Sequence, residues 1–133
     1  MNISETAKLT GLTSKMIRDY EHIGLISPAQ RSQSGYRQYG SQDLDTLRFI
    51  KHARDVGFSL AQIQTLLNLK NSPHRTSAEV KQLVGGHLDT LHQKIARLQS
   101  MADTLQSWHD CCKGNADPDC AIIDRLSDTQ NTL

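Results

Sequence analysis

Apolar side chains recur at helical spacing along almost the whole chain, and only residues 25–39 break this pattern. Near the start, Asn2 followed by Glu5 predicts the beginning of a short helix. Its predicted apolar face consists of Ile3, Ala7 and Leu9. Gly11 ends this helix, so the chain begins with a helix of about two turns.

A second short helix follows, for which Thr13 is the predicted N-cap. Its apolar positions are Met16, Ile17, Tyr20 and Ile23, and Gly24 ends it. The opposite face carries polar side chains, namely Ser14, Lys15, Arg18, Asp19 and His22. Two short helices separated by a glycine-containing turn are typical of a helix-turn-helix.

The region between residues 25 and 39 predicts a short hairpin, of the kind called a wing in DNA-binding domains, with its turn at Ser34-Gly35. A third helix is predicted from Ser41 to Gly57, with Leu44, Leu47, Ile50 and Ala53 facing inward. Ser59 and Gln62 form the capping box of a fourth helix, which ends before residues 71–73. Its apolar residues are Leu60, Ile63, Leu66 and Leu67.

The longest periodic stretch begins at the capping box of Thr76 and Glu79. Its apolar residues alternate at spacings of four and three, which is the a/d pattern of a coiled coil. We call these residues the seam; they are Val84, Leu88, Leu91, Ile95, Leu98, Ala102 and Leu105. A helix of roughly thirty residues is on the order of 45 Å long, too long for one small domain to cover. We therefore favour a dimer over a helix folded back on its own domain, although Gly85-Gly86 weakens the helix.

Composition changes the interpretation of the two ends. The chain has a formal charge of +1, which by itself suggests no polyanionic partner. However, residues 1–54 hold 8 Lys+Arg against 5 Asp+Glu, whereas residues 55–133 hold 7 against 9. The N-terminal part is therefore the better candidate for an anionic partner. With no apolar run long enough for a membrane span and no secretory signal at the start, we expect a cytoplasmic protein without a membrane partner.

Lys15 and Arg18 lie three residues apart on the exposed face of the second helix, so both can enter one DNA groove. Arg31, Tyr36 and Arg37 of the hairpin are placed to reach phosphates or the minor groove. Each charge alone is an ordinary solvated side chain; together on a helix-turn-helix with a wing they favour DNA binding. The predicted DNA-contact residues are Thr13, Ser14, Lys15, Arg18, Tyr20, Arg31, Tyr36, Arg37 and Arg54.

Three cysteines in a chain without an export signal argue against a disulfide scaffold and for a thiol or metal site. Cys112 and Cys120 bracket a loop rich in Gly, Asn and Asp that can bring their sulfurs together. Thiolates select soft ions such as Cu(I), whereas Zn(II) commonly takes four ligands. The spacing alone is equally compatible with a pair of free thiols, and the roles of Cys111 and His109 stay open.

The run AKLTGLTSKMIRDYEHIGLISPAQRSQSGYRQY resembles the N-terminal domain of the MerR family of transcription regulators. The match includes I-R-x-Y-E-x-x-G-L at residues 17–25 and G-Y-R-x-Y at residues 35–39, and it extends over residues 1–108. Asp19 departs from the family, which usually has an aromatic residue there. The resemblance implies a mainly α fold: a winged helix-turn-helix, a long antiparallel coiled-coil dimerisation helix and a short metal-binding loop.

The resemblance also implies boundaries and partners. We expect a DNA-binding domain with connecting helices at residues 1–70 and a dimerisation helix at 76–109. A metal-binding loop with a short helix follows at 110–127, and residues 128–133 form a disordered tail. Such regulators bind promoter DNA as homodimers and, with effector bound, distort an overlong promoter spacer so that RNA polymerase engages both elements.

The segment C-K-G-N-A-D-P-D-C resembles the metal-binding loop of the CueR-type copper-efflux subgroup, which implies that Cys112 and Cys120 are the ligands. Sensors of divalent ions and mercury in the family have a cysteine where this chain has Ser77, so Ser77 resembles the monovalent-ion group. The expected effector is Cu(I), with Ag(I) and Au(I) not distinguished by two sulfurs. The alternative is a thiol redox regulator of the same fold that uses Cys111, Cys112 and Cys120, whereas the helix-turn-helix and the wing argue against a copper buffer or chaperone without a DNA role. No arrangement of residues indicates an enzyme.

Overall fold

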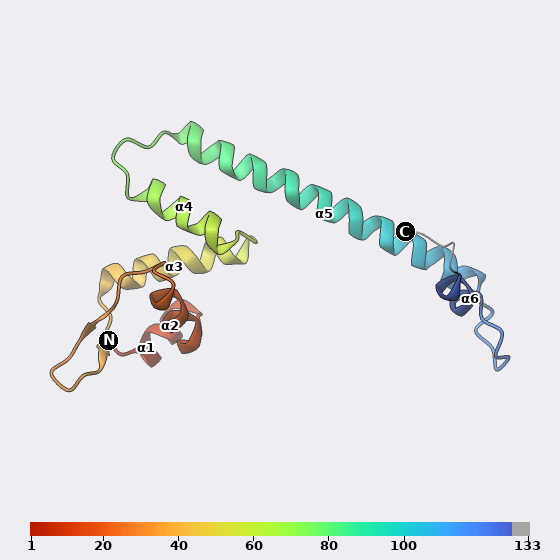
Figure 1. The fold of residues 1–133 in the computed structure, drawn as a ribbon, viewed down its shortest axis with the longest axis horizontal. Coiled ribbons are helices and arrows are strands. Elements are labelled where there is room, and N and C mark those ends of the chain that lie inside the picture. The colour runs from red at the N-terminus through yellow and green to blue at the C-terminus, as the bar shows by residue number, and fades with distance from the viewer. Residues whose placement is uncertain (129–133) are drawn as a thin grey trace. The chain divides into compact units, whose positions relative to one another are not determined.

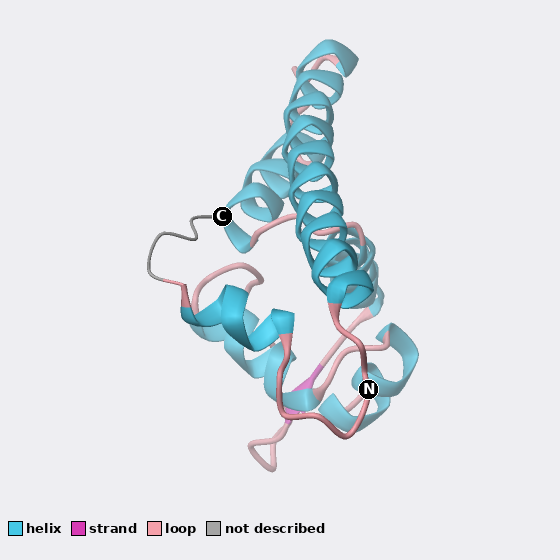
Figure 2. Cartoon of the chain, turned by 90° about the vertical axis from the view of Figure 1, so that its right-hand side faces the viewer, coloured by secondary structure: helices cyan, strands magenta, loops and turns pink. Residues whose placement is uncertain are grey.

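The computed structural model describes residues 1–128, which form six helices and one two-stranded hairpin (Figures 1 and 2). The described residues divide into two compact units, residues 1–80 and the residues from 81 onward. In chain order the elements are α1 (Ile3–Thr10), α2 (Ser14–His22), β1 (Gln30–Arg31), β2 (Arg37–Gln38), α3 (Ser41–Asp55), α4 (Leu60–Lys70), α5 (Ser77–Cys111) and α6 (Ala121–Ser127). This mainly helical fold with one long helix confirms the predicted fold class.

The helices begin where the sequence places their caps. The side-chain oxygen of Asn2 accepts the Glu5 N–H at 2.9 Å, and the Thr13 hydroxyl accepts the Met16 N–H at 3.0 Å. Reciprocal capping boxes start α4, between Ser59 and Gln62, and α5, between Thr76 and Glu79. Between α1 and α2, Gly11 takes a φ of +74°, a left-handed conformation that suits glycine.

The core of residues 1–80 is built from the predicted apolar positions of α2, α3 and α4. Its fully buried apolar side chains are Ile17, Leu47, Ile50 and Ile63. Two predicted core residues are wrong, because Leu9 is 53% exposed and Ile23 is 55% exposed. On α1 the buried residues are instead Thr6 and Thr10.

The buried threonines of α1 have their hydroxyls satisfied within the helix itself. Thr6 Oγ1 donates to the Asn2 carbonyl and Thr10 Oγ1 donates to the Thr6 carbonyl, each at 2.8 Å. Because such bonds remove the cost of burying a hydroxyl, two threonines can face the core of a helix that the apolar pattern orients differently.

The predicted hairpin is present as a small wing that spans residues 30–38. β1 and β2 pair antiparallel, with Gln30 opposite Gln38 and Arg31 opposite Arg37. At the tip, Gly35 takes a φ of +84°, and the Ser32 N–H donates to the Tyr36 carbonyl at 2.7 Å. The wing is therefore closed by the turn that Ser34-Gly35 predicts.

α5 is one unbroken helix of 35 residues, which corresponds to about 52 Å. Gly85 and Gly86 lie inside it and do not end it. Five seam residues are large apolar side chains left exposed in the single chain: Val84 37%, Leu88 47%, Ile95 61%, Leu98 62% and Leu105 57%. The seam therefore lies on a face of α5 that the described part of this chain leaves largely open.

Beyond α5 the chain forms a loop and then α6, where the sequence predicts a short helix. The predicted disordered tail at 128–133 lies outside the described residues except for Asp128. Among the described residues, no helix combines the length and the apolar character that a membrane crossing requires.

Candidate functional site

The exposed face of α2 carries the predicted DNA-contact cations. Lys15 is 84% exposed and its ammonium lies 3.1 Å from the Asp19 carboxylate, one helical turn away. Arg18 is also exposed on this helix. Asp19, the residue that departs from the family pattern, thus pairs with a predicted contact residue at the surface, where such a pair is weak and easily exchanged for a phosphate.

The wing presents a second set of predicted contacts. Tyr36 is 70% exposed near its tip. Arg31 is exposed, and its Nη1 donates to the Gly35 carbonyl at 2.9 Å, so part of this guanidinium supports the turn. Arg54 is exposed in the last turn of α3. Thr13 serves as the cap of α2, and Ser14 is half-buried beside it.

Tyr20 requires a correction. The sequence includes it among the DNA contacts, but its side chain is 4% exposed and forms part of the core. Its hydroxyl is buried without a hydrogen-bond partner among the described residues. The helical spacing that makes Tyr20 follow Ile17 inward also keeps it off the surface that Lys15 and Arg18 share.

Glu21 is a residue that the sequence reasoning missed. Its Oε2 lies 3.1 Å from Arg37 Nε, and its Oε1 accepts the Tyr39 hydroxyl at 2.5 Å. Burial and this bond to Glu21 raise the pKa of Tyr39, so the phenol stays a neutral donor. The available signal was an acidic residue beside the buried Tyr20 on an amphipathic helix.

The structure brings Cys112 and Cys120 together. Their Sγ atoms lie 3.5 Å apart across the loop, and both side chains are half-buried. Cys111 is the last residue of α5 and is exposed. The adjacent cysteines therefore differ as expected for neighbours at a helix end: Cys112 faces Cys120, whereas Cys111 lies at the surface.

The Cys120 thiol lies directly before α6, and its pKa is below the ordinary value. The causes, largest first, are the backbone N–H of Ile123 and the neighbouring Cys112 thiol, with the N–H of Ile122 adding to them. Although the Cys120 side chain forms no capping hydrogen bond, these backbone N–H groups still stabilise negative charge on its sulfur. This environment favours the thiolate, which is the form that binds metal ions.

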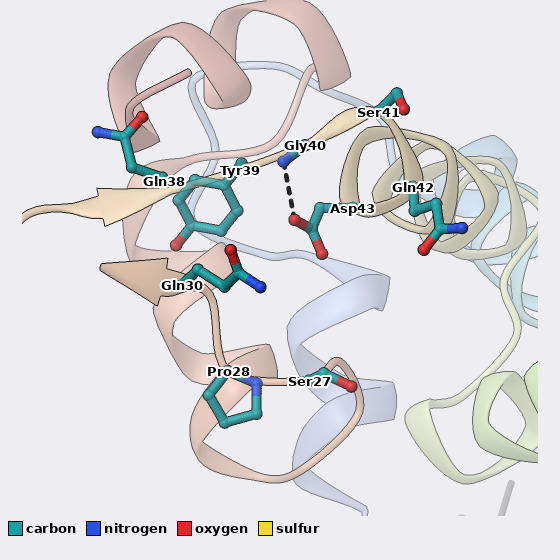
Figure 3. A pocket seen from close by; sticks show the side chains of 9 residues that line it. All are labelled: Ser27, Pro28, Gln30, Gln38, Tyr39, Gly40, Ser41, Gln42 and Asp43. Atoms are coloured by element: carbon teal, nitrogen blue, oxygen red, sulfur yellow. Dashed lines mark hydrogen bonds between the residues drawn. The ribbon is translucent and has the colours of Figure 1, made fainter. Parts of the chain in front are cut away.

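The described residues offer no larger donor set. No group of three or more His, Cys, Asp or Glu side chains within residues 1–128 is arranged to hold a metal ion. A cavity of about 500 Å³ beside the wing is lined by amides, hydroxyls and one carboxylate, that of Asp43 (Figure 3). Asp43 already accepts the Gly40 N–H at 2.9 Å. The two facing thiols are therefore the candidate ligands for a soft ion.

Comparison with known proteins gives a consistent result along the chain. A family model described as MerR HTH family regulatory protein matches residues 1–70. A second model, described as MerR, DNA binding, matches residues 44–108. The matched segments together include the helix-turn-helix, the wing and nearly all of the long helix.

Similar proteins cover almost the full length of the chain. A probable heavy metal-dependent transcriptional regulator of Haemophilus influenzae is 57% identical over 96% of this chain and 99% of its own. The regulator CueR of Escherichia coli O6:H1 is 46% identical over 96% of this chain and 94% of its own. The crystal structure of the transcription regulator PbrR691 from Ralstonia metallidurans CH34, in complex with lead(II), is 29% identical. It superposes with a TM-score of 0.81 over 96% of this chain and 99% of that one.

Proposed function

The chain belongs to the MerR family of helix-turn-helix regulators, and from this membership we propose a copper-responsive transcription activator. Family membership and the heavy-metal-dependent relatives support DNA binding and a response to a metal. These relatives are transcription regulators and not enzymes. The finer proposal is that a homodimer binds promoter DNA and responds to Cu(I), or to Ag(I) or Au(I), in the cytoplasm.

One observation carries the choice of effector: the Sγ atoms of Cys112 and Cys120 lie 3.5 Å apart, and no third donor joins them in the described residues. Two soft thiolates suit a monovalent soft ion, whereas zinc in structural sites usually takes four ligands. Cys112 at the end of α5 and Cys120 at the start of α6 would hold the ion, which would then link the two helices. In the PbrR691 complex the bound ion is lead(II), so the fold alone does not select the metal.

Dimerisation through the seam would place the partner subunit next to this site. Antiparallel pairing of two α5 helices would bring the start of one helix to the end of its partner. Ser77, the exposed first residue of α5, would then lie near the cysteine pair of the partner subunit. A hydroxyl in place of a thiol adds no soft donor, which supports a two-sulfur site selective for monovalent ions.

The proposed output is a change in promoter geometry. The two helix-turn-helix units of a dimer would contact two half-sites, and the wings would add backbone contacts. Ion binding would favour one of two dimer conformations, in which the promoter is bent and untwisted so that RNA polymerase engages both of its elements. The cost of deforming the DNA would be offset by these contacts.

A second function, a thiol redox regulator, is favoured by the same sulfur distance. An oxidant such as a peroxide could take two electrons and two protons from Cys112 and Cys120, forming a disulfide and two waters. Because an S–S bond is about 2.05 Å long, the sulfurs would need to approach by roughly 1.5 Å. Such a switch would require no metal.

Transcription from the cognate promoter separates these functions. Cu(I), Ag(I), Zn(II) and a peroxide are offered separately to the reduced wild-type protein with RNA polymerase. We expect activation by Cu(I) and Ag(I) and none by Zn(II). Activation by peroxide alone would establish the redox function instead, and activation by Zn(II) would contradict the two-sulfur site.

A further inference from the structure

We propose that Glu21 is a positioning residue for DNA binding, which fixes the wing against α2 although its own side chain is buried. The proposal rests on the DNA-binding part of the proposed function. Glu21 sits on the helix that presents Lys15 and Arg18, yet its side chain is only 9% exposed. A carboxylate is buried at a cost unless its oxygens are paired, so its partners indicate its role.

Both carboxylate oxygens of Glu21 contact β2 or the residue that follows it. Oε2 pairs with Nε of Arg37, which lies in β2. Oε1 accepts the hydroxyl of Tyr39, which follows β2 directly and is 3% exposed. One carboxylate thus joins α2 to two positions of the wing strand, spaced two residues apart and therefore on one face of it.

Apart from those of Glu21, the hydrogen bonds that join the wing to the rest of residues 1–128 involve Met1 and the end of β2. The strands of the wing contain two residues each, and a two-stranded hairpin of this size is marginal by itself. The bond from Arg31 to the Gly35 carbonyl is internal to the wing. The backbone N–H of Tyr39 donates to the Met1 carbonyl at 2.8 Å, and the Met1 ammonium donates to the Tyr39 carbonyl at 3.1 Å and to Gln38 Oε1 at 3.5 Å. These bonds fix the end of β2 but not Arg37. Figure 3 shows Tyr39 at this base, with its hydroxyl turned away from Gly40 and Asp43.

Arg37 is the residue through which Glu21 would act on DNA. Its Nε is taken by Glu21, and within residues 1–128 no hydrogen bond is formed by its two Nη groups. The Arg37 side chain is 31% exposed, so its guanidinium can be held by Glu21 at Nε while the Nη groups stay available to a phosphate. An arginine fixed in this way can bind a phosphate without first losing its rotamer freedom.

Replacing Glu21 with Gln should change DNA affinity in the direction opposite to the one that its charge alone predicts. Glu21→Gln keeps the size of the side chain and an acceptor for Tyr39, but it sets an amide N–H₂ against Arg37 Nε. It also removes a negative charge from the DNA-binding unit. General electrostatics therefore predicts tighter binding to DNA, whereas loss of positioning predicts weaker binding.

The test measures affinity against salt concentration for a duplex that the wild-type protein selects from a random-sequence pool. The variants are Glu21→Gln, Arg37→Gln, both together, and Asp19→Asn, which removes an exposed carboxylate from the same helix. We expect Glu21→Gln to bind about tenfold more weakly. Its log–log salt slope should fall by about 0.9 for each phosphate that the wing no longer neutralises. Asp19→Asn should bind as tightly as the wild type or more so.

The double variant tests whether Glu21 acts through Arg37. We expect it to bind like Arg37→Gln alone, because that substitution already removes the guanidinium through which Glu21 would act. Unchanged or tighter binding of Glu21→Gln overturns the proposal, and so do fully additive losses. If Glu21→Gln fails to fold by circular dichroism, Arg37→Gln carries the test, and unchanged affinity and slope overturn the proposal. Failure of the wild type to select any duplex would count against the proposed function, not against Glu21.

Discussion

Residues 1–80 and the described residues from 81 onward differ in how much of their apolar surface they bury by themselves. The first unit has its own core around Ile17, Leu47 and Ile63, and its helices are capped within the chain. The second exposes a row of apolar seam residues, including Ile95 at 61% and Leu98 at 62%. The first unit buries its apolar side chains in its own core, whereas the second has an apolar face that the described residues leave exposed.

This difference explains how one chain can combine a stable DNA-binding surface with a responsive sensor. Groups that must keep a fixed geometry, such as Arg37 on Glu21, are tied by side-chain bonds inside the first unit. The two thiols flank the loop between α5 and α6, where a bound ion would add a link between the two helices. Such a site would respond to an ion to the extent that the ion binds one conformation better than another.

Breaking the seam should have the largest effect. Leu98→Asp places an unpaired charge where a partner helix is proposed, which should destabilise the dimer by at least about 3 kcal/mol. DNA binding and induction should disappear with it. Sedimentation equilibrium measures the dimer. Gln93→Asp, an equal charge change off the seam, serves as the control, and equal dimerisation of the two variants would refute the seam assignment.

Removing one of the two sulfurs should abolish the response to metal without changing DNA binding by the first unit. Cys112→Ser or Cys120→Ser should abolish metal-dependent transcription, because one thiolate leaves half the donor set. Promoter affinity of the ion-free protein should stay within about twofold, a change of less than about 0.5 kcal/mol. Gel-shift and transcription assays measure both properties. Wild-type induction in both variants would show that the ion binds elsewhere.

Arg18→Ala should act on the other unit alone. Removing a groove or phosphate interaction should cost about 1–3 kcal/mol of promoter affinity, with and without ion. Fluorescence anisotropy in both states measures it, with Lys94→Ala on α5 as the matched charge control. A defect confined to the ion-bound form would place Arg18 in signalling and not in DNA contact.

The smallest effect concerns the glycines of α5. No atom of the described chain lies within 4 Å of a Cβ added at Gly85, so alanine meets open space. Gly85→Ala should therefore stabilise the helix by about 1 kcal/mol in thermal unfolding. A lower melting temperature would instead show that the partner helix needs this space.

Local features of the fold were predictable from sequence, and long-range ones were not. The caps at Asn2, Thr13 and Ser59 depend on residues three positions apart, so their bonds can be inferred from the sequence alone. Leu9 was misplaced because the apolar pattern cannot register that Thr6 and Thr10 bond within their own helix. Polarity alone is a weak guide on helices of two turns.

The candidate sites follow the same division. The meeting of Cys112 and Cys120 was predictable because a short loop joins them, and the structure places their sulfurs 3.5 Å apart. The buried position of Tyr20 was predictable too, because it lies three residues after Ile17 on the apolar face of α2, and only its assignment as a DNA contact was wrong. The role of Glu21 was not predictable, since it depends on how the wing meets α2. Tyr39, the hydrogen-bond partner of Glu21, is 18 residues away in the sequence.

The central claim is that two thiolates of one loop bind a soft monovalent ion. Anaerobic titration of the reduced protein with Cu(I) against a competing chelator tests it most directly, on the wild type and on single serine variants of the three cysteines. We predict one tightly bound ion per chain for the wild type and for Cys111→Ser. Cys112→Ser and Cys120→Ser should each bind the ion at least about 100-fold more weakly. Replacing a residue that only supports a metal ligand typically lowers the affinity by about 10- to 100-fold. Loss of binding in Cys111→Ser, or tight binding retained by either of the other two, would contradict the claim.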